Sequence, residues 1–118
     1  MEIQPITINT ILYCRHWLAN VQFYRDVLGL QVSHETDWFV EFKITENSFV
    51  SIADVDRATI DDCHGSGVTL SWQVDDLGLV RDRLLEKGVA IGPVRKKWGA
   101  HVCYFKDPEG YRIELWSC

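Results

Sequence analysis

The chain has 118 residues, of which 47% are hydrophobic and 25% are charged, a composition typical of soluble globular proteins. A chain of this length buries roughly two-thirds of the surface that its unfolded form exposes, which is enough for one hydrophobic core. The formal net charge of -5 repels phosphate backbones. We therefore expect a single folded domain over residues 1–118 that binds no nucleic acid.

The first residues do not have the features of an export signal. The segment from Met1 to Pro5 contains an acid and a proline where a signal peptide needs basic and apolar residues. No apolar run approaches the ~18 residues that a membrane span requires. The four cysteines form neither a C-x-x-C pair nor a disulfide framework. We expect a cytoplasmic protein with reduced thiols and no membrane partner.

The first half of the chain predicts one helix among four strands. A strand-like run over about 6–14 precedes an amphipathic stretch over about 16–28, whose apolar residues recur at helical spacing. Gly29 follows this stretch, and glycine ends helices in the left-handed conformation without strain. Three further β-rich segments follow, over 30–35, 38–44 and 49–53. The first module therefore spans about 6–54.

The second half repeats the same order after a linker over about 55–67, which is rich in Asp, Gly and Ser. The second module spans about 68–118, and its helix ends at Gly88, half a chain length after Gly29. Its predicted strands cover 68–74, 89–94, 100–106 and 111–116, with a helix over about 76–87. Proline and glycine in the segment Asp107 to Gly110 predict a turn between the last two strands. We expect Arg95, Lys96 and Lys97 to lie on a solvated loop.

Three motifs in order identify a family resemblance. They are the run from Phe23 to Leu30 (FYRDVLGL), the run from Val74 to Leu77 (VDDL), and Trp98-Gly99 followed by the run from Asp107 to Leu115 (DPEGYRIEL). Together they resemble the glyoxalase, bleomycin-resistance and extradiol-dioxygenase group, also called the vicinal oxygen chelate superfamily. The resemblance implies an α+β fold of two βαβββ modules forming a curved half-open mixed sheet, with the helices on the convex side and the ligand on the concave side. It also implies a homodimer whose sites draw residues from both chains.

Metal-dependent members of this family hold a divalent ion at positions that the resemblance places in this sequence. The first strands of the two modules carry Asn9 and Thr69 at these positions, and the last strand carries Glu114. The fourth strand of the first module offers Ser51 or Ile52. An amide, a hydroxyl and one carboxylate are poor ligands for a transition metal. We therefore expect no cofactor, with Glu114 as the one retained ligand position.

Strand alternation predicts which side chains share the ligand side. If Asn9 and Glu114 face inward, the period of two also turns inward Ile11, Tyr13, Ser71, Gln73, Arg112 and Trp116. On the neighbouring strand either Cys103 and Phe105 or Val102 and Tyr104 face inward, depending on loop length. Fosfomycin-resistance members use a tyrosine at the position of Tyr104, so the resemblance favours the second arrangement.

Two features of this predicted site suggest its chemistry. Glu114 is a charged group in an otherwise apolar strand, so it needs either a ligand or an ion pair with Arg112. Trp38, Trp98 and Trp116 lie at loop edges or on the ligand side, where flat rings stack on planar or cationic ligands. The predicted ligand-binding residues are Asn9, Ile11, Tyr13, Trp38, Thr69, Ser71, Trp98, Tyr104, Arg112 and Trp116, with Glu114 as the candidate catalytic residue.

Three functions are compatible with these residues. The leading interpretation is a dimeric small-molecule binding protein of the bleomycin-resistance type, which sequesters an aromatic or heteroaromatic ligand in a metal-free cleft and prefers cations. The first alternative is a metal-dependent lyase or dioxygenase in which nonstandard ligands join Glu114. The second is a metal-free enzyme in which Glu114 or Tyr104 acts as general acid or base. The missing metal ligands favour binding over catalysis.

Overall fold

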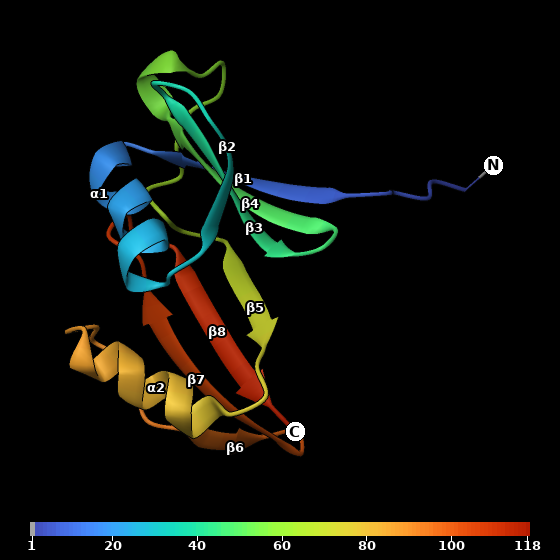
Figure 1. Ribbon diagram of the computed structural model, residues 1–118, viewed down its shortest axis with the longest axis vertical. Coiled ribbons are helices and arrows are strands. Elements are labelled where there is room, and N and C mark those ends of the chain that lie inside the picture. The colour runs from blue at the N-terminus through green and yellow to red at the C-terminus, as the bar shows by residue number, and fades with distance from the viewer. Residues whose placement is uncertain (1) are drawn as a thin grey trace. The chain divides into compact units, whose positions relative to one another are not determined.

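The computed structural model describes residues 2–118, which form two compact units with the boundary after Asp62. Each unit contains one four-stranded mixed sheet and one main helix (Figure 1). The chain is therefore an α+β protein built of two βαβββ modules, as predicted. Within residues 2–118, neither main helix is long and apolar enough to span a membrane.

The first unit begins with a parallel pair of strands that are distant in sequence. Its elements are β1 (Ile8–Cys14), α1 (Trp17–Gln22), a π-helical turn (Phe23–Val27), β2 (Gln31–Glu35), β3 (Phe39–Thr45), β4 (Ser48–Asp54) and a short 3-10 turn (Val55–Arg57). The sheet order is β1-β4-β3-β2, with β1 parallel to β4 and the other pairs antiparallel.

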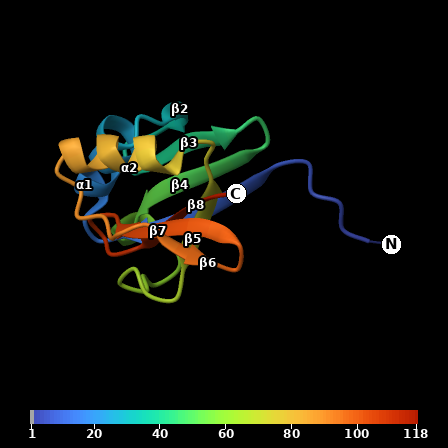
Figure 2. The same cartoon turned by 90° about the horizontal axis from the view of Figure 1, so that it is seen from below.

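The second unit repeats this topology. Its elements are β5 (Thr69–Gln73), α2 (Leu77–Glu86), β6 (Arg95–Lys97), β7 (Ala100–Lys106) and β8 (Arg112–Ser117). The order is β5-β8-β7-β6, again with one parallel pair, β5 and β8. Figure 2 shows α2 on one side of this sheet. The matching order in both units confirms the internal repeat that the two glycines predicted.

Both helices end at the predicted glycines. Gly29 has φ +70° and Gly88 has φ +84°, which are left-handed values. The last turn of the first helix widens before its glycine, since Leu28 N–H donates to Phe23 C=O at 3.0 Å. At the start of α2 the Asp76 carboxylate accepts a hydrogen bond from Leu79 N–H at 3.0 Å. A capping aspartate thus marks where α2 begins, and a left-handed glycine marks where each helix ends.

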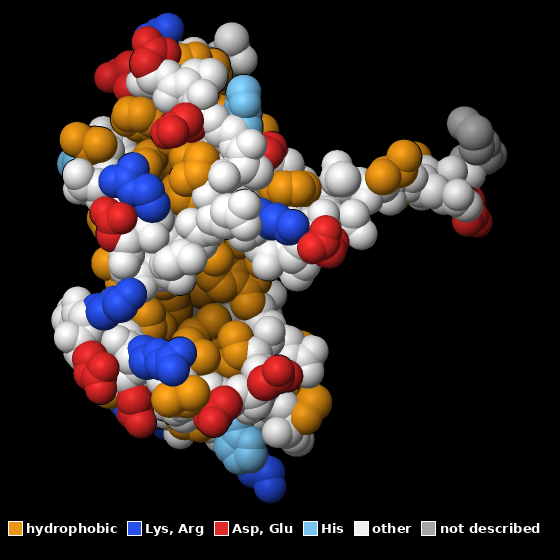
Figure 3. Space-filling model, viewed as in Figure 1, with side chains coloured by type: hydrophobic (Ala, Val, Ile, Leu, Met, Phe, Trp, Pro, Cys, Tyr) orange, Lys and Arg blue, Asp and Glu red, His pale blue; other side chains and the backbone are white. Residues whose placement is uncertain are grey.

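One face of each sheet forms the core with its helix. The buried hydrophobic residues of the second unit are Leu70, Leu77, Leu84, Ile91, Val102, Cys103, Phe105, Tyr111, Ile113 and Leu115, of which Val102 lies on the face of Trp116. In the first unit the core comprises Leu12, Cys14, Val21, Tyr24, Val40, Phe42, Val50 and Ile52. Figure 3 shows acidic and basic side chains intermixed over the part of the surface where α2 lies. Because successive side chains of a strand point to opposite faces, every second side chain of these strands lies on the face away from the helix.

The predicted strand over 89–94 is wrong, because this segment is not a strand and β6 lies just after it. Pro93 has no N–H to donate to a sheet ladder. The segment is held instead by hydrogen bonds to Gly92, whose N–H donates to Tyr104 C=O at 3.0 Å and whose C=O accepts from Arg81 Nε at 2.8 Å. The basic run predicted to lie on a loop forms β6, which pairs with β7 and is solvated.

Candidate functional site

The free face of the second sheet carries most of the predicted site. Thr69 pairs with Arg112 and Ser71 with Glu114 across β5 and β8. Tyr104 pairs with Glu114 and Val102 with Trp116 across β7 and β8, so these side chains share one face. Cys103 and Phe105, the other arrangement left open by the sequence, are buried on the core face.

The Glu114 carboxylate is held by hydroxyl groups. Ser71 Oγ donates to Glu114 Oε1 at 2.5 Å. The pKa of Glu114 is lowered, chiefly by this hydrogen bond and further by a hydrogen bond from Tyr104 and the charges of Arg112 and Lys97, although partial burial acts in the opposite direction. Glu114 is therefore an ionised acceptor at neutral pH.

Arg112 acts on Glu114 by charge at longer range, because its direct contacts lie elsewhere. Its Nε donates to Thr69 Oγ1 at 2.9 Å, and its guanidinium carbon lies 4.7 Å from the centroid of the Tyr104 ring. Among residues 2–118, no ion pair includes Glu114 or Arg112. Of the two alternatives that the sequence left open for Glu114, the ion pair with Arg112 does not form: the carboxylate accepts hydrogen bonds from the hydroxyls of Ser71 and Tyr104, and the guanidinium stacks on Tyr104.

A cavity of about 320 Å³ opens beside Glu114. It is lined by Ser71, Lys97, Trp98, Ala100, Val102, Glu114 and Trp116. Trp98 is 90% exposed at the tip of the β6–β7 hairpin, where its φ of 49° is unusual for a bulky residue. Lys97 Nζ lies 4.7 Å from the Trp98 ring centroid, whereas Trp116 is half-buried on the sheet. Trp116 is therefore the ring better placed to stack on a ligand in this cavity.

In the first unit, Asn9 belongs to a polar network on the free face of the sheet. Asn9 Oδ1 accepts from Ser51 Oγ at 2.8 Å, and Asn9 Nδ2 donates to Glu41 Oε1 at 3.2 Å. Ser33 Oγ donates to the other oxygen of Glu41 at 2.7 Å. Glu41 was missed by the sequence reasoning, although its buried neighbours Val40 and Phe42 indicate that it faces the Asn9 side.

The remaining predicted residues of the first unit lie on or beside its sheet. Ile11 is 39% exposed and Tyr13 is half-buried, both on the Asn9 side of β1. Trp38 precedes β3, and its ring packs edge-on against Phe39 with 5.6 Å between the ring centroids. Of the predicted ligand-binding residues, the structure thus gathers Ser71, Trp98 and Trp116 with Glu114 around one cavity.

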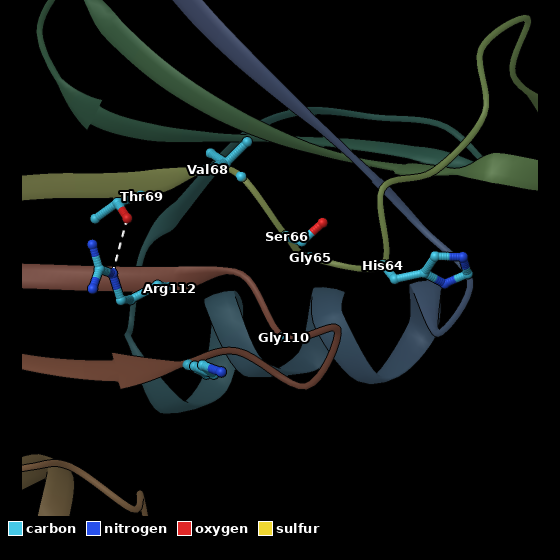
Figure 4. A pocket seen from close by; sticks show the side chains of 9 residues that line it. His64, Gly65, Ser66, Val68, Thr69, Gly110 and Arg112 are labelled. Atoms are coloured by element: carbon cyan, nitrogen blue, oxygen red, sulfur yellow. Dashed lines mark hydrogen bonds between the residues drawn. The ribbon is translucent and has the colours of Figure 1, made fainter.

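A second cavity in the second unit, of about 540 Å³, includes Thr69 and Arg112 (Figure 4). The loop 64–68 and the turn at Gly110 form its other walls, together with Lys106. The sequence reasoning placed neither this loop nor Lys106 at a site. Only the strand register brings Lys106 opposite Arg112.

The residues at the implied metal positions do not fit a divalent transition metal. Both polar atoms of the Asn9 amide already make hydrogen bonds, and the Thr69 hydroxyl accepts one from the cationic Arg112. Ser51 offers a hydroxyl, so Glu114 is the one ionised donor of the set. Over residues 2–118, no group of three or more His, Cys, Asp or Glu side chains could hold a metal ion.

Comparisons with known proteins agree with this architecture. Residues 7–115 match the model of the Glyoxalase/Bleomycin resistance protein/Dioxygenase superfamily. The uncharacterized protein YraH of Bacillus subtilis (strain 168) is 31% identical over 115 residues, covering 83% of this chain and 87% of YraH.

Two solved structures share the fold at low sequence identity. The lactoylglutathione lyase of Agrobacterium tumefaciens has a TM-score of 0.78 at 19% identity, over 98% of this chain and 96% of the lyase. TnmS3, an antibiotic binding protein from Streptomyces sp. CB03234, has a TM-score of 0.81 at 20% identity, over 99% of this chain and 98% of TnmS3. Since the family model covers almost the whole sequence, this chain belongs to the glyoxalase/bleomycin resistance protein/dioxygenase superfamily.

Proposed function

We propose that the protein is a small-molecule binding protein that sequesters an aromatic or heteroaromatic ligand without a metal. The observation that carries the proposal is the cavity beside Glu114, in which an ionised carboxylate lies next to the ring of Trp116. A planar ligand would stack on Trp116 and contact Val102. A positively charged or N–H group on the ligand would bind Glu114.

Two further points support binding rather than turnover. The hydroxyls of Ser71 and Tyr104 stabilise the charged form of Glu114 and lower its pKa, which suits an ionic anchor better than a proton donor. One relative with the same fold, TnmS3, is an antibiotic binding protein. Sequestration requires affinity alone.

A permanently cationic heteroaromatic probe, such as an N-methylquinolinium salt, should quench tryptophan fluorescence saturably, whereas a quinolinecarboxylate should not. Stacking on Trp116 contributes about 0.5 to 2 kcal/mol, and the Glu114 carboxylate adds charge attraction. Because the pKa of Glu114 is lowered, the affinity should stay constant from about pH 8 to about pH 5, above the ordinary Glu value of about 4.3. Fluorescence titration measures both effects.

Three variants make this titration specific. Glu114→Gln should weaken binding about tenfold, and Trp116→Ala should weaken binding and remove part of the quench. Trp38→Ala is the matched control, because the Trp38 ring packs against Phe39 and does not line this cavity, so little affinity should be lost. Preferential binding of the carboxylate would contradict the proposal, and turnover of the bound ligand would favour a metal-free enzyme that uses Glu114.

We also propose that the purified protein holds no stoichiometric transition metal, because Asn9, Thr69 and Ser51 are poor donors. Elemental analysis should find far less than one zinc, nickel, iron or manganese ion per chain. About one metal ion per wild-type chain, lost in Glu114→Gln, would contradict this prediction.

A homodimer in the cytoplasm completes the proposed function. Each sheet ends in edge strands, β1 and β2 in one unit and β5 and β6 in the other, and such edges are commonly covered by association. Light scattering at micromolar concentration should therefore report twice the chain mass of 13.6 kDa. A stable monomer would rule out a site that draws residues from two chains.

A further inference from the structure

Two cations face each other at one end of the second sheet. Lys106 is the last residue of β7 and Arg112 the first of β8, and the two are direct cross-strand partners. Both side chains line the cavity of about 540 Å³. Like charges directly opposite one another in a sheet are destabilising unless something compensates them.

In the part of the chain that the structure describes, no carboxylate forms an ion pair with Lys106 or Arg112, although Glu114 interacts with Arg112 by charge at longer range. The ion pairs of residues 2–118 all involve other side chains, and the Lys106 ammonium group has no hydrogen-bond or ion-pair partner among these residues. The lining of the cavity includes no Asp or Glu. In a chain with a net charge of -5, this is a local concentration of uncompensated positive charge.

The planar guanidinium group of Arg112 is held in place before any ligand binds. One edge of the guanidinium is fixed by the hydrogen bond from Nε to Thr69 Oγ1, drawn in Figure 4, and one face is stacked on Tyr104. Over residues 2–118, no acceptor occupies its two terminal nitrogens. A planar fork fixed in this way binds oxyanions with two parallel hydrogen bonds at a low cost in side-chain entropy.

The opposite wall of the cavity is a glycine-rich loop that a ligand can approach closely. Gly65 and Gly67 both have left-handed φ values, and Ser66 lies between them (Figure 4). Ser66 N–H and Ser66 Oγ already donate to Cys63 C=O, at 3.0 and 2.7 Å. Nothing lies within 4 Å of a Cβ built at Gly67, so a ligand can approach the loop at this residue. The basic pair thus supplies the donors, and the loop forms a wall of the same cavity that carries no side chain at Gly65 or Gly67.

We propose that this cavity is a second binding site, which takes a dianionic oxyanion group of phosphate-monoester chemistry between Lys106 and Arg112. It goes beyond the proposed aromatic-ligand site, since the two cavities share no lining residue. Lys106 supplies a point charge, and Arg112 supplies the bidentate fork. The site contains no tryptophan, so binding here leaves the fluorescence assay of the Glu114 cavity unaffected.

The test is a ¹H–¹⁵N NMR titration of the full chain with inorganic phosphate and with phenyl phosphate. The pH of about 8 lies above the second pKa of a phosphate monoester, about 6, and above the higher second pKa of inorganic phosphate, so both probes are dianionic. The amides of Gly65, Gly67 and Gly110 should shift saturably, with a Kd of about 1 mM or tighter for at least one probe. The indole N–H of Trp116 should not shift. Tighter binding of phenyl phosphate would identify an ester as the ligand, and equal binding would identify free phosphate.

Variants of exposed residues identify the source of the affinity. Arg112→Gln and Lys106→Gln should each weaken phosphate binding about tenfold, and Arg112→Lys should recover only part of the loss because the fork is missing. Lys96→Gln, an exposed change of equal charge on β6, should have no effect. Shifts that do not saturate, shifts reproduced by chloride at equal ionic strength, or unchanged affinity in both glutamine variants would overturn the proposal. Quinolinium binding is measured separately by fluorescence, so a negative result for one proposed site leaves the proposal for the other site standing.

Discussion

Asp107→Ala is expected to lower the free energy of unfolding by about 3 kcal/mol or more, because three backbone N–H groups lose one charged acceptor. Asp107 Oδ1 accepts from the N–H groups of Glu109, Gly110 and Tyr111 at 3.0, 3.0 and 2.9 Å. The Asp107 and Tyr111 residues are buried, at 5% and 2% exposure, so water cannot replace the lost acceptor cheaply. Thermal unfolding should show a midpoint lowered by roughly 10 to 20 °C.

Two matched variants separate this effect from a general loss of charge. Asp107→Asn keeps an oxygen in place and should cost much less than the alanine variant. Asp76→Ala removes the cap of α2, where the carboxylate holds one exposed N–H group, and should cost about 1 kcal/mol. A loss for Asp107→Ala no larger than that for Asp76→Ala would show that the turn does not depend on its aspartate.

The same turn illustrates what the sequence can predict. The pattern Asp-Pro-x-Gly identifies it directly. The period of two puts Tyr104 on the face opposite to Cys103 and Phe105, and the family resemblance favoured the arrangement in which Cys103 and Phe105 are buried. These predictions succeed because they depend on residues that are close in the chain. The two left-handed glycines that end the helices were likewise predictable from residues close to them in the chain.

The parts that could not be predicted depend on pairing between distant segments. The apolar run over 89–94 has the composition of a strand, yet Pro93 cannot donate to a ladder. The polar run at Arg95–Lys97 becomes β6 because the turn at Trp98 and Gly99 folds it back onto β7.

The candidate site shows the same limit. Strand register brings Glu41 within hydrogen-bond distance of Asn9 and places Lys106 opposite Arg112. Register depends on loop geometry as well as on alternation. Alternation therefore predicts the face on which each of these side chains lies, but not its cross-strand neighbour.

Gly65→Ala should destabilise the protein by roughly 2 to 5 kcal/mol, combining a left-handed backbone penalty with overpacking against fixed atoms. Gly65 has φ +76°, and a Cβ there would lie 2.5 Å from the Gly110 carbonyl carbon and 2.8 Å from Glu109 O and Tyr111 N. All three are backbone atoms of the turn that Asp107 holds, so none can rotate away as a side chain would. Chemical denaturation of the variant measures the loss.

Gly67→Ala is the matched control for this variant. Gly67 has φ +78°, but nothing lies within 4 Å of a Cβ built there, so only the conformational cost of about 1 to 2 kcal/mol applies. The difference between the two variants isolates the contact between the loop and the turn. If both lose the same stability, the loop stands clear of Gly110 and the wall of the proposed phosphate site is not rigid. If Gly65→Ala loses more, its altered loop should also weaken phosphate binding while quinolinium binding beside Glu114 is retained.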